Sequence, residues 1–147
     1  MIKTIADPSQ YPFEWLDVTD PSEEEVRQLR EKYGLHASSI KDWLQPDHLP
    51  KYEDVGSYVF IIFRMHSEKV GTEADTVTEL TDKLAIFMTK ERVITMHKKD
   101  WGAPEVIREE QVDQHSCEDT VHLVYEIIKS CIATYEAPSL KLTKDIE

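Results

Sequence analysis

The sequence predicts an α/β domain in which a sheet is layered with helices. Several short apolar runs are rich in β-branched and aromatic residues, as is typical of strands: residues 58–63, 84–88 and 93–96. Segments with apolar residues at helical spacing precede and follow these runs: residues 20–33, 36–45, 103–112 and 118–136. Because strands and helices are interspersed along a chain of 147 residues, we expect one layered domain.

The composition argues against nucleic acid as a partner. The net charge is −12 and the isoelectric point is near 4.9, so no basic stripe is available to neutralise phosphates. The acidity is compatible with attracting cations, although solubility is the simpler explanation. The first ten residues contain no apolar signal core, and no run of about 18 apolar residues occurs, so nothing in this chain is expected to span a membrane.

The two cysteines, Cys117 and Cys131, are not expected to form a disulfide with each other. On one helix they would lie about 21 Å apart, at about 1.5 Å per residue. A disulfide needs Cα atoms within about 7 Å. A reducing, cytosolic setting is therefore the simplest interpretation.

The first elements are a short strand and a capped helix. Residues 13–18 alternate apolar and polar for part of their length, which favours a strand. Asp20 is expected to cap the following helix, and Glu23 can return a hydrogen bond to the cap backbone. Gly34 is expected to end this helix in a left-handed conformation, which costs glycine little.

A second, shorter helix and a buried strand come next. Residues 36–45 place Ile40, Trp43 and Leu44 on one helical face, and Pro46 should stop the helix. A turn and an acidic corner follow. The run from residue 58 to 63 has no polar gap, which predicts a central strand covered on both faces.

The remaining elements complete the sheet and add two helices. We expect a strand over residues 76–80, an antiparallel hairpin from 84–88 and 93–96, and a helix over 103–112. The last helix should begin near residues 116–119, run to about Glu136, and be kinked or broken by Pro138. Its apolar stripe is expected to consist of Val121, Val124, Tyr125, Ile128, Ile132 and Tyr135. The pattern continues to Glu147 without a stop signal, as expected of a piece of a longer chain.

No enzyme signature is present. The four glycines form neither a phosphate-binding loop nor a dinucleotide-binding turn, and no nucleophile elbow occurs. A dense group of possible metal ligands, His115, Cys117, Asp119 and His122, lacks the paired spacing of a structural zinc site. We therefore favour a helix cap for this group and do not expect an enzyme.

Three carboxylates near the second helix are the candidate metal ligands. Asp42 lies on that helix, and Glu53 and Asp54 lie on the corner after it. A hard cation such as Mg²⁺ needs several converging oxygens, some of which these acids could supply. The alternative is that they are solvated charges or partners of Lys51 and Arg64.

Motifs along most of the chain resemble the N-terminal cytoplasmic domain of the CorA family of divalent-cation transporters. The match in the centre of the chain consists of Gly34-Leu35-His36, Asp42 and Leu49-Pro50-Lys51-Tyr52-Glu53, in the order and spacing of the family. Three further segments are similar to the family's opening strand, its hairpin and the start of its first helical arm: Trp15-Leu16-Asp17-Val18, residues 84–97 and residues 118–147.

The resemblance implies a mixed parallel and antiparallel sheet layered between helices and ending in a long helical arm. Residues 1–116 would form the cytoplasmic funnel domain, and residues 117–147 would start the arm that leads toward the membrane. The family implies a homopentamer at the cytoplasmic face of the inner membrane, whose funnel senses Mg²⁺ and gates a pore. The Gly-Met-Asn signature of that pore is absent, so this chain is expected to meet the membrane only through a missing C-terminal part.

The sequence departs from the family at the regulatory metal site. The family's acidic pair on the second helix is Lys41-Asp42 here, and a second acidic position on the arm falls on Lys129. Two cations in place of two anions should weaken Mg²⁺ binding, or form an internal ion pair with Asp42. Asp42 is therefore the expected surviving metal contact, with Glu53 and Asp54 beside it.

We therefore predict the cytosolic regulatory domain of a CorA-like magnesium transporter that lacks its pore. Its expected partners are a divalent cation and further copies of itself. A zinc-transporting branch of the same family is one alternative, and a stand-alone soluble α/β interaction domain is another.

Overall fold

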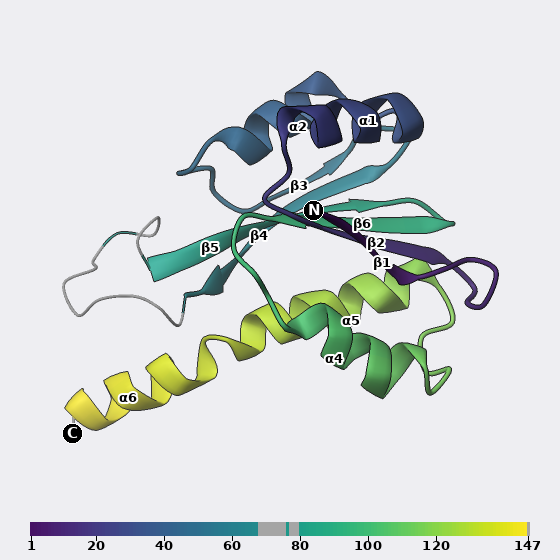
Figure 1. The fold of residues 1–147 in the computed structure, drawn as a ribbon. Coiled ribbons are helices and arrows are strands. Elements are labelled where there is room, and N and C mark those ends of the chain that lie inside the picture. Colours follow the sequence, from purple (N-terminus) through teal and green to yellow (C-terminus); the bar gives the residue numbers. More distant parts are fainter. Residues whose placement is uncertain (68–75, 77–79, 147) are drawn as a thin grey trace.

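The computed structural model describes residues 1–67, 76 and 80–146 and confirms the α/β class (Figure 1). Its sheet has the order β1-β2-β6-β5-β4-β3. The strands are β1 (Ile2–Ala6), β2 (Glu14–Thr19), β3 (Lys51–Asp54), β4 (Val59–His66), β5 (Thr81–Met88) and β6 (Arg92–His97). Strands β2 and β6 pair in parallel and the other neighbours pair antiparallel, so the sheet is mixed, as the resemblance implied.

Helices cover both faces of the sheet (Figure 1). One face carries α1 (Glu23–Tyr33) and α2 (Ala37–Leu44). The other carries α4 (Ala103–Ile107), a π-helical continuation η1 (Arg108–Val112) and α5 (Thr120–Ala133). Helix α6 (Glu136–Ile146) follows α5 and projects away from the sheet (Figure 1).

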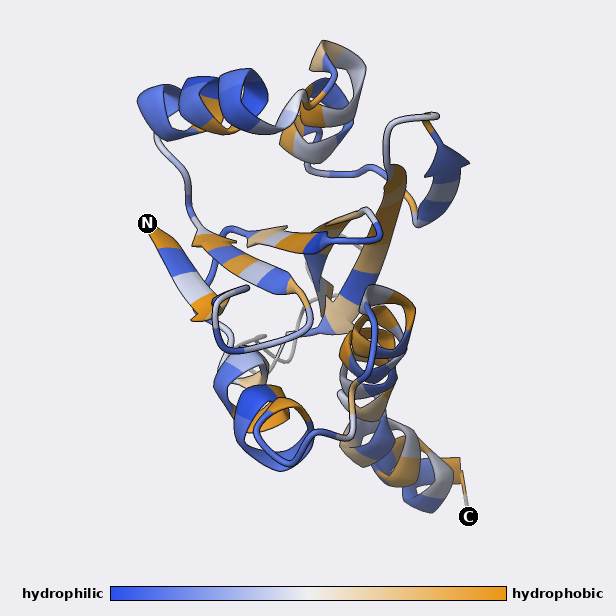
Figure 2. Ribbon diagram, turned by 90° about the vertical axis from the view of Figure 1, so that its right-hand side faces the viewer, coloured by the Kyte–Doolittle hydropathy of each residue, from blue (hydrophilic) through white to orange (hydrophobic). Residues whose placement is uncertain are grey.

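The sheet separates two apolar cores because successive side chains of a strand point to opposite faces. The core under α1 and α2 includes Trp43, Phe60, Ile62, Phe87 and Met96. The core under α4 and α5 includes Trp15, Leu84, Ile86, Leu123 and Ile127. Figure 2, coloured by hydropathy, shows that the strands carry many hydrophobic residues and that α1 is mostly hydrophilic.

The N-cap of helix α1 lies two residues later than the cap predicted at Asp20. Ser22 is the N-cap: its Oγ accepts a hydrogen bond from Glu25 N, and Ser22 N donates to Glu25 Oε1, both at 3.1 Å. Asp20 instead has a φ of 42°. Its N–H donates to His97 O at 2.8 Å, so Asp20 adds a backbone hydrogen bond at the end of the β2–β6 pairing. Gly34 ends the helix with a φ of 67°, as expected.

The strand predictions are confirmed for β2 and for the β5–β6 hairpin and need correction elsewhere. Residues 59–63 of the apolar run belong to β4, and Tyr58 lies just before it. Strand β4 is covered on both faces but lies next to the edge strand β3 rather than at the centre. The strand expected over 76–80 falls mostly on 77–79, outside the described residues. Leu80 N donates to Thr76 O at 2.9 Å, and β5 begins at Thr81.

The stripe predicted on helix α5 is confirmed only in part. Val124 is buried and Ile128 packs against the core, whereas Val121, Tyr125 and Ile132 are exposed. The rest of the buried face consists of Leu123, Ile127 and Cys131. The helix carries apolar residues on more than one face, so spacing alone did not identify the buried one. Both cysteines are free, as predicted.

The break predicted near Pro138 lies between α5 and α6. Pro138 lacks an N–H, and its ring clashes with the carbonyl group four residues earlier. That carbonyl belongs to Thr134, which is the C-cap of α5. The break is tied to the end of β4: Thr134 Oγ1 accepts from His66 N at 2.8 Å, and Tyr135 Oη donates to Arg64 O at 2.7 Å. The boundary predicted between the funnel domain (residues 1–116) and the helical arm (residues 117–147) remains a prediction. Helix α5 packs on the sheet, whereas α6 has no buried residue.

Candidate functional site

Helix α2 holds the first predicted metal contact, and β4 fixes where that helix lies. Tyr58, just before β4, accepts a hydrogen bond at its Oη from His36 N at 2.9 Å and bonds Ser39 Oγ at 2.7 Å. These contacts join the first turn of α2 to the sheet. Asp42 lies one turn further on, next to the edge strand β3.

Asp42 and Glu53 converge on one cation, the ammonium group of Lys51. Lys51 Nζ lies 2.7 Å from Asp42 Oδ2 and 2.7 Å from Glu53 Oε2. Lys51 and Glu53 share a face of β3 because they are two residues apart. The structure therefore confirms that Lys51 is a partner of these acids, which was the alternative to metal binding.

The two carboxylates also act on the titration of Lys51. Their hydrogen bonds, that of Asp42 first, raise the pKa of Lys51 above its ordinary value. The ammonium therefore stays charged throughout the neutral range. It is partly accessible, since 28% of the Lys51 side chain is exposed, so solvent ions can compete for this position.

His48 lies at the same cluster. Its Nε2 is 3.5 Å from Asp42 Oδ1, and its Nδ1 is 2.8 Å from the carbonyl oxygen of Leu49. Imidazole nitrogen is a good ligand for zinc and a poor one for magnesium. His48 was not among the ligands predicted from the sequence.

Asp54 does not join Asp42 and Glu53. Its Oδ1 accepts a hydrogen bond from Gly56 N at 2.9 Å, within the turn that leads to β4. Gly56 has a φ of 98°, which favours glycine at this position. Neighbouring strand residues point to opposite faces, so Asp54 and Glu53 diverge. Within the described residues, no group of three or more His, Cys, Asp or Glu is arranged to hold a metal.

Within the part of the chain that the structure describes, neither lysine expected to weaken the site forms an ion pair with Asp42. Lys41 is exposed on α2. Lys129 lies on α5, across the sheet from α2, and its Nζ is 3.5 Å from Glu126 Oε2. The cation that the structure places beside Asp42 is Lys51.

The group at residues 115–122 is a helix cap, as favoured from its spacing. Asp119 is the N-cap of α5, and its Oδ1 accepts a hydrogen bond from His122 N at 2.8 Å. Cys117 is buried, and its burial, with the nearby carboxylates, raises the pKa of the thiol. His115 has a φ of 57° in the turn before α5.

A buried polar cluster between β2 and β6 was not predicted. Asp17 Oδ1 accepts from Thr95 Oγ1 at 2.6 Å, and His97 Nε2 lies 2.9 Å from both carboxylate oxygens of Asp17. Trp15 Nε1 donates to Thr95 Oγ1 at 3.1 Å. The parallel pairing that aligns Asp17 with Thr95 joins distant segments, so no local pattern reveals this cluster.

Two buried cations hold the end of α2. Arg64 donates from Nε to His48 O at 3.0 Å and from Nη2 to Pro46 O, and Lys83 Nζ donates to Gln45 O. Gln45 is the C-cap of α2, and carbonyls at a helix end lack intrahelical partners and carry partial negative charge, so the Lys83 cation stabilises this end. Pro46 and His48 belong to the turn that follows the helix. The prediction that Arg64 pairs with one of the three acids is therefore wrong, because its donors point to two carbonyls and to the Thr81 hydroxyl.

The comparisons of sequence with known proteins agree on one family. A model of the family described as "CorA-like Mg2+ transporter protein" matches residues 12–147. The curated cobalt/magnesium transport protein CorA of Methanocaldococcus jannaschii is 26% identical over 87 residues, which cover 59% of this chain and 25% of that protein. The chain thus matches about a quarter of the length of that relative.

Solved structures show the same fold. The soluble domain of the M. jannaschii CorA has a TM-score of 0.69 at 20% identity, covering 95% of this chain and 55% of the other. The full-length CmaX protein has a TM-score of 0.75 at 17% identity, covering 95% and 42%. The ZntB cytoplasmic domain of Vibrio parahaemolyticus has a TM-score of 0.68 at 14% identity, covering 90% and 53%.

The described helices include none that is both long enough and apolar enough to cross a bilayer. The family assignment rests instead on the extent of the match, which leaves out only the first 11 of 147 residues. The shared fold with the solved CorA soluble domain extends over 95% of this chain. This chain therefore belongs to the family of CorA-like Mg²⁺ transporter proteins.

Proposed function

We propose that this chain is the cytosolic regulatory domain of a CorA-like divalent-cation transporter, and not an enzyme. The observation that carries the proposal is the family match over residues 12–147, which runs through the sheet and on into α5 and α6. In this proposal the sheet region senses the cation and α6 transmits its state toward a membrane part. The domain lies at the cytoplasmic face of the inner membrane.

The proposed metal contact is Asp42, with Glu53 as the second carboxylate. Their support is that both already bind one cation, the Lys51 ammonium, at 2.7 Å. Magnesium is commonly bound through one or two carboxylates and keeps several waters. Asp54 remains a proposed contact only after rearrangement, because it faces away. Lys51 thus competes with Mg²⁺ for the two carboxylates.

The experiment is a calorimetric titration of the chain with Mg²⁺. Asp42→Ala should abolish binding, and Lys51→Met should strengthen it by about tenfold or more, because a competing charge within ion-pair distance is removed. Lys90→Met, in the turn between β5 and β6, is the matched control and should leave binding unchanged. Equal Mg²⁺ binding by the wild type, D42A and K51M would contradict the proposal.

Zinc is the second candidate cation, because His48 Nε2 lies 3.5 Å from Asp42 Oδ1. The same titration with Zn²⁺ separates the two cations. A zinc site should lose affinity in His48→Gln, whereas a magnesium site should not. Loss of Zn²⁺ binding in H48Q together with weak Mg²⁺ binding would favour the zinc-transporting branch.

Self-association is also proposed, with a homopentamer as the assembly of the full-length protein. Its support in this chain is the apolar surface that α5 and α6 leave uncovered. Ile132, Leu140, Leu142 and Ile146 are each at least 58% exposed. A stand-alone α/β interaction domain is the alternative, and an encoded chain that lacks two apolar spans downstream would favour it.

A further inference from the structure

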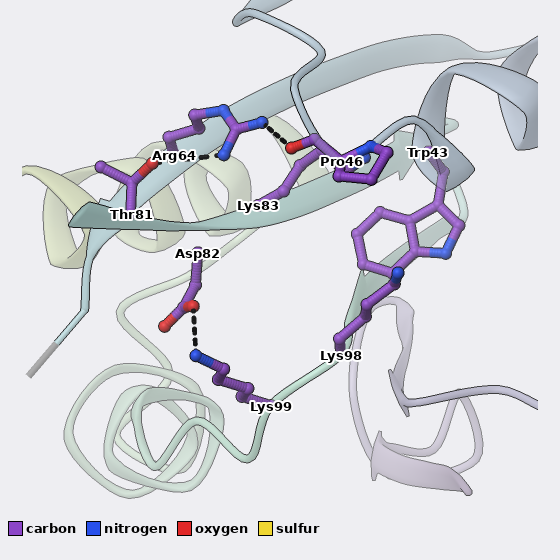
Figure 3. Close-up of a pocket in the computed structure, with 8 residues that line it drawn as sticks. All are labelled: Trp43, Pro46, Arg64, Thr81, Asp82, Lys83, Lys98 and Lys99. Carbon is purple, nitrogen blue, oxygen red and sulfur yellow. Dashed lines mark hydrogen bonds and ion pairs between the residues drawn. The ribbon is translucent and has the colours of Figure 1, made fainter. Parts of the chain in front are cut away.

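A cavity of about 170 Å³ opens beside the C-terminal end of α2 (Figure 3). Four cationic side chains line it, against one carboxylate, that of Asp82: Arg64, Lys83, Lys98 and Lys99. The protein as a whole has a net charge of −12, so this concentration of positive charge runs against its composition. Asp42, Lys51 and Glu53 do not line the cavity, although Lys83 Nζ donates to the main-chain oxygen of Asp42.

Two of these cations are buried. Arg64 is 4% exposed and Lys83 is 9% exposed. Buried cations are usually paired with anions, because removing a charge from water is costly. Within the described residues, however, neither forms an ion pair with a carboxylate. Their partners are neutral oxygens, namely Pro46 O, His48 O and Thr81 Oγ1 for Arg64, and Asp42 O and Gln45 O for Lys83.

The charge on these groups is incompletely compensated. Burial, followed by the charges of Arg64 and Lys98, lowers the pKa of Lys83 to about 8. Burial also lowers the pKa of Arg64. Carbonyl oxygens at the end of α2 and in the turn after it account for the direction of these two side chains. They do not account for two further lysines at the same cavity, and those lysines add to the repulsion.

The rim of the cavity is accessible. Lys98 and Lys99 follow β6 and are exposed, and Lys99 Nζ lies 3.3 Å from Asp82 Oδ1. Figure 3 shows the Asp82–Lys99 pair on one side of the opening and the side chains of Lys98 and Trp43 on another. An anion that enters can therefore meet the rim lysines first and the buried cations behind them.

We propose that this cavity binds a phosphate group, with Lys83 and Arg64 behind it and Lys98 and Lys99 at its rim. The volume is that of roughly five or six water molecules in the liquid, which suits a phosphate group rather than a whole nucleotide. A phosphate has several acceptor oxygens and more than one negative charge at neutral pH, so it can meet several cationic donors together. Its binding removes the mutual repulsion of the buried pair.

The test is a calorimetric titration of the 147-residue chain with inorganic phosphate at pH 7 and low salt. Saturable binding in the millimolar range or tighter is expected. Lys98→Gln and Lys99→Gln should each weaken it by about three- to tenfold, because each removes one charge-assisted contact. Lys90→Gln removes an exposed lysine from the distant β5–β6 turn and should change nothing. Chloride at equal ionic strength controls for general screening.

A second readout follows Lys83 itself, by the NMR chemical shift of its side-chain amine at a fixed pH of 7. Phosphate bound in the cavity should shift this signal saturably, because Lys83 lines the cavity. Titration with AMP shows whether a phosphomonoester is accepted through its phosphate. The assignment to the free ion would be overturned if AMP bound and inorganic phosphate did not. The site itself would be overturned if neither ligand bound saturably. Wild-type affinity in both K98Q and K99Q would also overturn it.

Discussion

At the scale of single residues, the Asp17–His97 pair is the buried interaction with the clearest dependence on pH. Both side chains are buried, at 6% and 1% exposed. Burial by itself lowers the pKa of His97, but the hydrogen bond and charge of Asp17, with the Lys99 carbonyl, outweigh it and raise the pKa above 6.5. The imidazole nitrogens are thus held between the Asp17 carboxylate and a carbonyl oxygen.

The raised pKa predicts the sign of a stability change. The folded state binds the His97 proton more tightly than the unfolded chain does, so this contribution is complete below pH 6.5. It is lost as the pH rises through the raised folded pKa. We expect the free energy of unfolding in urea to exceed that of His97→Gln by about 3–5 kcal/mol at pH 6. The difference should shrink as the pH rises above neutrality.

Asp17→Asn is the matched variant for this prediction. It keeps a side chain of the same shape and removes the charge that raises the pKa of His97. Burial then dominates, so the fall in stability above neutral pH should disappear. A wild-type slope in D17N would show that the pH dependence arises from another group.

The residues of the candidate site differ in how far the sequence could predict them. Asp42, Lys51 and Glu53 lie within 12 residues, so local spacing was enough to suggest their contact. Asp17 and His97 are 80 residues apart and meet through the register of two parallel strands. Apart from the Thr81 hydroxyl, the partners of Arg64 and Lys83 are backbone carbonyls, which carry no side-chain signal. These contacts required the tertiary structure.

At the scale of elements, the start of α1 depends on the capping box of Ser22 and Glu25. Ser22→Ala should lower the free energy of unfolding by about 1 kcal/mol, because the Glu25 N–H loses its side-chain acceptor. Ser22→Gly should cost only a few tenths of a kcal/mol, since glycine suits an N-cap. Urea denaturation measures both. Equal losses in S22A and S22G would contradict the capping role.

Elements with strong local signals were predicted well, and edge elements were not. The β5–β6 hairpin and β4 are continuous apolar runs, and α1 and α2 have clear stripes and stops. Strand β3 consists of Lys51–Asp54, whose polar composition is typical of a loop, and its strand geometry comes from pairing with β4. Strand β1 likewise depends on pairing with β2. Helix α5 has two apolar faces, and packing against the sheet determines which of them is buried. The spacing of residues along one helix does not reveal which face that is.

At the scale of the whole molecule, the uncovered apolar surface of α5 and α6 predicts self-association. Sedimentation should show a mass that rises with protein concentration. Ile132→Glu and Leu142→Glu, at 58% and 61% exposed positions, should shift the chain toward monomer because a charge in an apolar contact is costly. Leu49→Glu is the control, at a 64% exposed position in the loop before β3. A wild-type chain that stays monomeric at all concentrations would contradict this prediction.

The parallel contact between β2 and β6 has a consequence for how the chain folds during synthesis. Strands β1 and β2 pair with each other, but β6 alone joins them to the rest of the sheet. A ribosome that adds about 5–20 residues per second needs about 4–16 seconds to pass from Thr19 to His97. Until then the β1–β2 ribbon has no further strand to join, and an isolated two-stranded ribbon is marginally stable. The amino-terminal segment therefore emerges first and is incorporated late.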